Sequence, residues 1–150
     1  MSDNTYDLGA HNVRWDDVYA TNTSIQSSDR NKKNTIVDSD LGLSFINKLK
    51  PVSYKFNDGT RTHYGLIAQD VETVLSDISK PTTDFAGFIK TDLPDEYYQE
   101  AEPHIPEGKN EGDLKSAAHT EYGLRYGEFI SPLIKAVQEL SAKVAALEAA

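Results

Sequence analysis

The chain has 150 residues, of which 38% are hydrophobic and none is cysteine, and its formal net charge at pH 7 is −9. This length corresponds to one ordinary domain. The negative charge argues against a general nucleic-acid binder, and the lack of cysteine excludes disulfides and thiolate metal sites. No apolar run approaches the roughly 18 residues that a membrane span needs. The low apolar content indicates either apolar surface shared between chains or a long polar loop.

The N-terminal residues 1–26 combine turn-forming residues with two short strand candidates, 13–15 and 17–20. We interpret this region as a β-arm in which Trp15 is a packing anchor. It has neither the basic region nor the apolar core of a secretion signal. Its abrupt start is typical of a piece cut from a longer protein, and an arm that packs on its own domain is the alternative.

A serine and a lysine five residues apart, Ser28 and Lys33, are the candidates for catalysis. A serine becomes a useful nucleophile when a base takes its proton, and a deprotonated lysine can be that base. The neighbouring Arg30 and Lys32 disfavour the ammonium form of Lys33. Because serine and lysine are common, the spacing by itself is weak, and a solvated turn is the alternative interpretation.

Two peptide bonds lie next to this serine. Attack of its hydroxyl on the carbonyl of Ser27 closes a five-membered ring, whereas attack on its own carbonyl needs a strained four-membered ring. A reaction within one chain therefore favours the Ser27–Ser28 bond. Attack by a serine of another chain would permit a cut between Ser28 and Asp29.

An apolar helical face follows the candidate dyad. Residues 38–40 offer N-cap oxygens ahead of Leu43, Ile46 and Leu49, whose spacing predicts a helix that ends before Pro51. Phe45 is expected beside this face.

The next elements are expected to form a hairpin and a second helix. Alternating apolar residues predict a strand over 52–56, Asp58-Gly59 predicts a tight turn within 57–60, and a return strand is expected over 63–68. A helix is predicted over 70–75 with three inward-facing residues, Val71, Val74 and Leu75.

Residues 79–119 form a polar stretch that holds most of the negative charge. Nine acidic residues lie between positions 81 and 113, against two lysines. A structureless loop of this length would be unusual, so we expect short elements inside it, around residues 84–89.

The C-terminal segment has the clearest periodicity in the chain. Its apolar residues alternate in steps of three and four, and we call them the seam: Ile130, Leu133, Val137, Leu140, Val144 and Leu147. Such a heptad pattern predicts a helix that packs against partner helices. The alternative is an amphipathic helix on the core of its own domain. β-Branched residues alternating with leucine favour a parallel dimer on pattern alone.

The order of these features resembles a known family. Ser28-Asp29 and a basic run are followed by Leu41-Gly42-Leu43, by Pro51-Val52-Ser53-Tyr54, by Tyr64-Gly65-Leu66-Ile67-Ala68-Gln69-Asp70-Val71-Glu72 and by a helical tail. This order resembles the self-cleaving intramolecular chaperone at the C-terminus of phage tail fibres and tailspikes, the peptidase S74 family. The resemblance covers residues 27–150.

The resemblance implies an α+β fold, with a small hairpin core, flanking helices and a long C-terminal helix that assembles as a trimeric bundle. Residues 1–27 would be the end of the upstream fibre or tailspike, residues 28–150 the chaperone domain, and residues 130–150 its trimerising helix. The chaperone would template folding of the β-rich fibre in the host cytoplasm. After cleavage it would be absent from the mature virion. The implied trimer conflicts with the dimer pattern of the seam, and both stay open here.

The resemblance also implies roles for individual residues. Ser28 would be the nucleophile, Lys33 the base, and Ser27, Ser28 and Asp29 the cleavage site. Family members often carry a basic residue three places after the serine, where this chain has Asn31. The pair Ser27 and Lys32 has the same spacing as the dyad but ranks second, because the family motif places an aspartate directly after the serine. Support for the site would come from three further residues, Arg30, Lys32 and His63.

No cofactor or metal is expected, because the histidines share no ligand-like spacing and no Gly-rich phosphate loop is present. The expected partners are two further copies of the chain and the upstream fibre, with no nucleic acid and no membrane. The alternative function is a non-cleaving trimerisation or interaction module of the same fold. Cleavage that waits on assembly would act as a checkpoint, because a lysine in an unfolded chain keeps its proton at neutral pH.

Overall fold

The computed structural model describes residues 8–9, 14–22, 25–99 and 105–150. The chain divides into two compact units, Met1–Val37 and Asp38–Ala150. In the first unit the described residues form one regular element, the 3₁₀ helix η1 (Arg30–Lys32), and all of them are exposed.

The β-arm predicted for the first unit is wrong for the residues that the structure describes. Residues 14–22 form no strand, and Trp15 is 63% exposed rather than packed. The predicted strand at 13–15 lies partly outside the described residues. A strand needs a partner strand for its backbone N–H and C=O groups. The described part of this unit contains no strand that could pair with residues 14–22.

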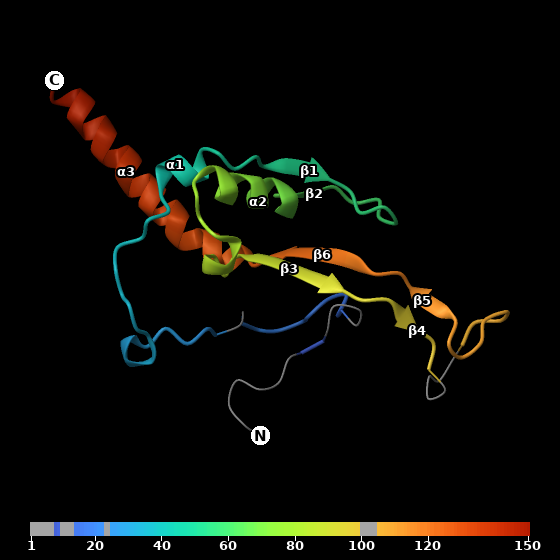
Figure 1. Ribbon diagram of the computed structural model, residues 1–150. Helices are drawn as coiled ribbons and strands as arrows, with labels where there is room; N and C mark the ends of the chain where they lie inside the picture. Colours follow the sequence, from blue (N-terminus) through green and yellow to red (C-terminus); the bar gives the residue numbers. More distant parts are fainter. Residues whose placement is uncertain (1–7, 10–13, 23–24, 100–104) are drawn as a thin grey trace. The chain divides into compact units, whose positions relative to one another are not determined.

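The second unit is a small α+β fold of short antiparallel strand pairs and helices (Figure 1), as predicted. The pairs are β1 (Val52–Tyr54) with β2 (His63–Gly65), β3 (Phe88–Leu93) with β6 (His119–Leu124), and β4 (Glu96–Tyr97) with β5 (Leu114–Ser116). The helices are α1 (Leu43–Ile46), α2 (Ala68–Asp77) and α3 (Ile130–Glu148), with 3₁₀ helices η2 (Thr82–Asp84) and η3 (Tyr126–Phe129).

Helix α1 is shorter than the sequence predicts. It ends at Ile46, and the chain continues in tighter turns in which Lys48 N donates to Phe45 O and Leu49 N to Ile46 O. A three-residue apolar spacing suits such 3₁₀-type turns as well as an α-helix, which explains the difference. Phe45, expected beside the apolar face, is 1% exposed and lies at the centre of the core.

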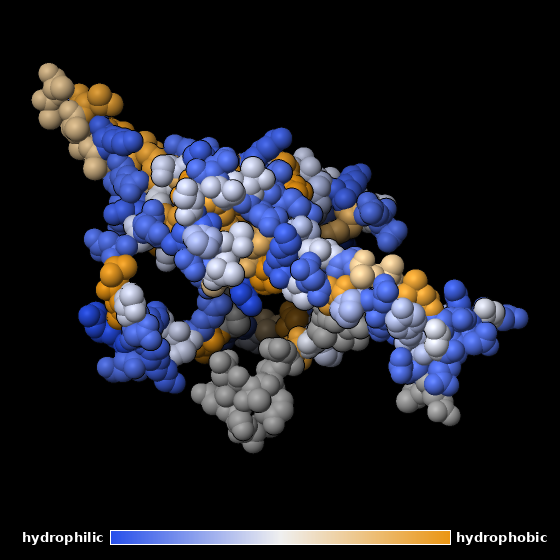
Figure 2. Space-filling model, in the orientation of Figure 1, coloured by the Kyte–Doolittle hydropathy of each residue, from blue (hydrophilic) through white to orange (hydrophobic). Residues whose placement is uncertain are grey.

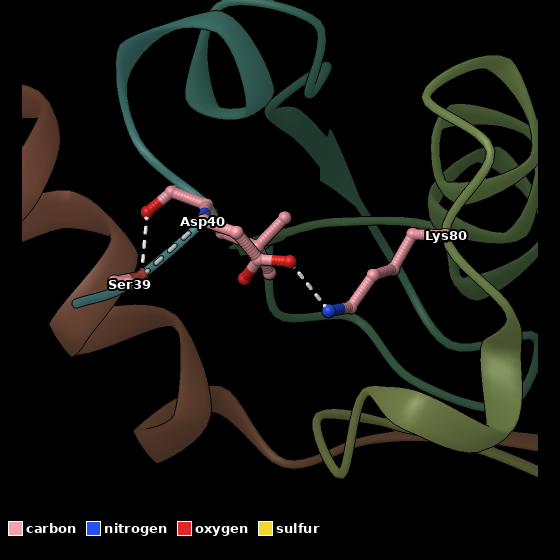
Figure 3. Close-up of polar contacts among 4 residues, drawn as sticks. Ser39, Asp40 and Lys80 are labelled. Carbon is pink, nitrogen blue, oxygen red and sulfur yellow. Dashed lines mark hydrogen bonds and ion pairs between the residues drawn. The ribbon is translucent and has the colours of Figure 1, made fainter. Parts of the chain in front are cut away.

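The predicted caps of α1 are also wrong. Gly42 occupies the N-cap position and no side chain of the preceding polar run caps the helix. Ser39 Oγ instead donates to Leu41 O at 2.9 Å and accepts from Leu41 N at 3.3 Å, a local turn that Figure 3 shows.

The hairpin and α2 are found where the sequence places them. Val52 pairs with Gly65 and Tyr54 with His63, although both strands are shorter than predicted. The turn between them is closed by Gly59 N donating to Phe56 O at 2.9 Å. Helix α2 is longer than predicted at both ends, and its predicted inward-facing residues are buried: Val71, Val74 and Leu75.

A second hairpin begins inside the acidic stretch and ends just after it. The sequence predicted only short elements near residues 84–89. Strands β3 and β6 pair along six residues, from Phe88 with Leu124 to Leu93 with His119. The side chains of β3 do not alternate between buried and exposed, because its three central residues are all exposed. Polar contacts such as Thr120 Oγ1 to Asp92 Oδ1, at 2.6 Å, connect the strands instead.

The core of the second unit lies between α1, α2, the start of β3 and η3. Three phenylalanine rings meet there: Phe45 and Phe85 have centroids 5.8 Å apart, and Phe85 and Phe129 are 5.2 Å apart. The buried members of the cluster are Leu41, Phe45, Val71, Val74, Leu75, Phe85, Phe88 and Phe129. In the described part of the chain no helix is both long enough and apolar enough to cross a membrane.

Candidate functional site

The candidate dyad is formed within the first unit. Lys33 Nζ donates a hydrogen bond to Ser28 Oγ over 2.8 Å. The geometry therefore places the amine where it can take the hydroxyl proton once it is neutral. Among the described residues, the competing pair Ser27 and Lys32 makes no such contact.

The short helix η1 brings these two side chains together. Lys32 N donates to Asp29 O, and Lys33 N donates to Arg30 O, both at 3.1 Å. The side chain of Asp29 caps this turn, because its Oδ1 accepts from Asn31 N at 2.9 Å. The predicted supporting residues Arg30 and Lys32 thus lie in the turn itself.

The dyad is open to solvent in the isolated chain. Residues 25–37, which include all the predicted cleavage-site residues, are exposed. No described residue of this one chain shields the two side chains from water.

His63, the remaining predicted supporting residue, lies in the second unit on β2. Its ring stacks on Tyr54 with centroids 5.7 Å apart and meets Phe56 edge-on at 5.1 Å. Both partners belong to the same hairpin, so the structure gives this histidine a packing role there. Its role in cleavage stays a prediction.

The seam residues all lie on α3 and are 45 to 78% exposed. In Figure 2 the helix that projects from the second unit carries apolar side chains towards its C-terminal end. Within the described residues of its own unit, α3 packs through a different face. Pro132 and Ala136 are buried, and Glu139 Oε2 accepts from Leu43 N at 2.9 Å, next to Gly42.

Glu139 is thus a structural residue that sequence reasoning missed. Its carboxylate caps α1 from another helix, and a Cβ at Gly42 would lie 2.7 Å from it. The partners are far apart in sequence, so no local pattern could have indicated the contact.

A second anchor joins the start of this unit to the end of α2. Lys80 Nζ lies 2.6 Å from Asp40 Oδ2 (Figure 3). This hydrogen bond from an ammonium group holds the pKa of the Asp40 carboxyl below its ordinary value. Within the second unit, this contact joins the first residues to the chain that follows α2.

A third contact joins α2 to the hairpin of β3 and β6. Lys90 Nζ donates to Glu72 Oε1 at 2.9 Å and lies 5.4 Å from the centroid of the Tyr122 ring. The hydrogen bond to Glu72 raises the pKa of Lys90. The described residues contain no cluster of histidine, aspartate and glutamate side chains that could hold a metal ion.

Comparisons with known proteins agree with the resemblance seen in the sequence. A sequence model of the peptidase S74 family, described as the chaperone of endosialidase, matches residues 28–80. The match thus begins at Ser28 and includes Asp29 and Lys33. No curated protein matches the chain.

Two solved structures have a similar fold. One is the carboxy-terminal domain of the bacteriophage T5 L-shaped tail fibre with its intramolecular chaperone domain, with 21% identity and a TM-score of 0.70. That likeness covers 99% of this chain, and the chain spans 37% of the length of the T5 structure. The other is described as a novel intramolecular chaperone, with 24% identity and a TM-score of 0.52, and the likeness covers 82% of this chain and 100% of that one.

Proposed function

We propose that this chain is the intramolecular chaperone domain of a phage tail fibre or tailspike and that it releases itself by cleaving next to Ser28. The observation that carries the proposal is the 2.8 Å contact between Lys33 Nζ and Ser28 Oγ, at the start of the segment that matches the family. Residues 1–27 are then the end of the fibre, and residues 28–150 are the chaperone.

The cleavage proceeds through an ester. Neutral Lys33 takes the proton of Ser28 Oγ, and the oxygen attacks the carbonyl carbon of the scissile bond. The C–N bond breaks, the proton on Lys33 passes to the departing amine, and an ester to Ser28 Oγ remains. Water then hydrolyses the ester, so that the net reaction is hydrolysis of one peptide bond. Within one chain the scissile bond is Ser27–Ser28, and attack by a second chain permits cleavage after Ser28.

Assembly supplies the burial that this chemistry needs. The seam of α3 offers a face for two further copies of the chain, as in a trimeric bundle. The first unit also exposes large apolar side chains that a folded fibre would cover: Leu8, Trp15, Val18, Tyr19, Ile25, Ile36 and Val37. Cleavage therefore follows assembly in the host cytoplasm, and the chaperone part leaves the virion.

The test compares variants of the dyad by intact mass over time. Wild type should yield a C-terminal fragment that begins at Ser28 or Asp29, and the mass identifies the bond. Ser28→Ala should give none, whereas the matched control Ser27→Ala should cleave. Lys33→Arg keeps the charge but cannot lose its proton at a useful pH, so it should be as inactive as Lys33→Ala.

Other results would contradict the mechanism. If Ser28→Ala cleaves and Ser27→Ala does not, Ser28 is not the nucleophile. Cleavage by Lys33→Arg at the wild-type rate would remove lysine from the reaction. Wild-type cleavage should rise with pH, because only the neutral amine accepts the proton.

The second candidate function is a non-cleaving trimerisation module. The exposure of both dyad side chains in the isolated chain favours it. A wild type that remains intact while forming a stable trimer would establish this alternative.

A further inference from the structure

The side chain of Asp29 closes the turn that carries the dyad. Its Oδ1 accepts from Asn31 N at 2.9 Å, at the N-cap position of η1, and its backbone sits at φ −64° and ψ 129°. An aspartate at this position satisfies an amide that has no partner within the helix. The carboxylate thus contacts a backbone amide of the turn.

The dyad depends on this turn. Ser28 and Lys33 are five residues apart, and an extended chain would separate their Cα atoms by about 17 Å, well beyond the reach of a lysine side chain. The chain must therefore reverse between them, and η1 provides that reversal. Because η1 has no buried residue, hydrophobic packing within the described chain does not hold it. Its backbone hydrogen bonds and the Asp29 cap do.

We propose that Asp29 is a positioning residue for cleavage, and that it acts through the acceptor oxygen of its side chain rather than through its charge. This inference rests on the proposed autoproteolysis. It assigns a physical role to the residue that follows the nucleophile: Asp29 keeps the turn closed so that Lys33 Nζ stays within hydrogen-bond distance of Ser28 Oγ. An oxygen at the same distance from the backbone, as in asparagine, should serve equally well.

Three variants of the full chain separate geometry from charge. Asp29→Asn keeps the capping oxygen and loses the charge, Asp29→Glu keeps the charge but displaces the oxygen by one methylene, and Asp29→Ala loses both. We expect Asp29→Asn to cleave within about twofold of wild type. The cleavage rate of Asp29→Ala should be roughly 2- to 30-fold lower than that of wild type, the effect of losing an N-cap. Asp29→Glu should also cleave more slowly than wild type. Asp17→Ala, an exposed charge loss in the same unit, should leave the rate unchanged.

Two further readouts distinguish positioning from acid–base chemistry. Asp29→Asn and Asp29→Ala lose the same charge, so the pH dependence of their cleavage should have the same midpoint while their rates differ. In the non-cleaving Ser28→Ala chain, hydrogen exchange at the Asn31 amide should be slow with Asp29 or asparagine, and faster with alanine or glutamate.

The inference is overturned if Asp29→Glu cleaves like wild type while Asp29→Asn does not, or if the pH midpoints of Asp29→Asn and Asp29→Ala differ. Equal Asn31 exchange in all variants would overturn it as well. A wild type that never cleaves refutes the proposed function instead, and the exchange measurement still decides whether Asp29 holds the turn.

Discussion

Helix α3 has two neighbouring faces with different side chains and different surroundings. One face presents Pro132, Ala136 and Glu139 to α1, and its two apolar residues are buried. The other presents the large apolar seam, and each seam residue is at least 45% exposed. Ala136 and Val137 are consecutive, about 100° apart around the helix, yet their exposed fractions are 3% and 57%.

The size of the side chains on each face explains how one helix can contribute to two interfaces. Small residues allow α1 to approach closely and leave room for a carboxylate to cap it. Large residues on the adjacent face are only partly covered in the described part of the chain, and completing their burial would be worth on the order of 1 kcal/mol each. The alternative of an amphipathic helix whose seam packs on its own core is therefore not what the structure shows.

The largest expected effect comes from charging the exposed face. Val137→Asp combined with Leu140→Asp should dissociate the assembly, because a buried unpaired charge costs several kcal/mol. Light scattering gives the mass, and gel mobility shows whether cleavage stops as well.

The matched control places two aspartates on α3 away from both faces, as Gln138→Asp with Ala145→Asp, and it should remain assembled. A monomeric wild type would contradict the shared interface altogether. A dissociated double variant that still cleaves would show that the dyad needs only its own chain.

A smaller effect is expected from enlarging the packed face. Ala136→Leu should lower the free energy of unfolding by about 1 to 3 kcal/mol, because extra methyl groups must be accommodated in a packed interface. Urea unfolding measures the change. The same substitution at Ala145, which is exposed and lies on neither face, should be close to neutral. Equal effects at both positions would mean that Ala136 is not held in a packed interface.

The smallest effect concerns the cap. Glu139→Ala removes the acceptor of the Leu43 amide and should lower the free energy of unfolding by about 1 kcal/mol. Glu139→Gln keeps an acceptor oxygen and should lose less. If thermal unfolding of Glu139→Ala matches that of wild type, the contact between α3 and α1 does not contribute to stability.

Local chemistry explains what could be predicted. Asp58-Gly59 marked the turn of the first hairpin, the spacing of Val71, Val74 and Leu75 marked the buried face of α2, and the heptad steps marked α3. Each of these signals lies within one turn or one helix, where propensity and periodicity act directly. The errors arose where such signals were ambiguous, as in the three-residue spacing around α1.

The sequence by itself also determined the contact between Lys33 and Ser28, because both residues and the Asp29 cap lie within a single short turn whose hydrogen bonds are all local. Only the tertiary structure decided which face of α3 stays free, that Glu139 caps α1, that Lys80 holds Asp40, and that the acidic stretch pairs β3 with β6. Those contacts join residues 26 to 96 positions apart, and their partners are selected by packing and chain reversal rather than by any local pattern.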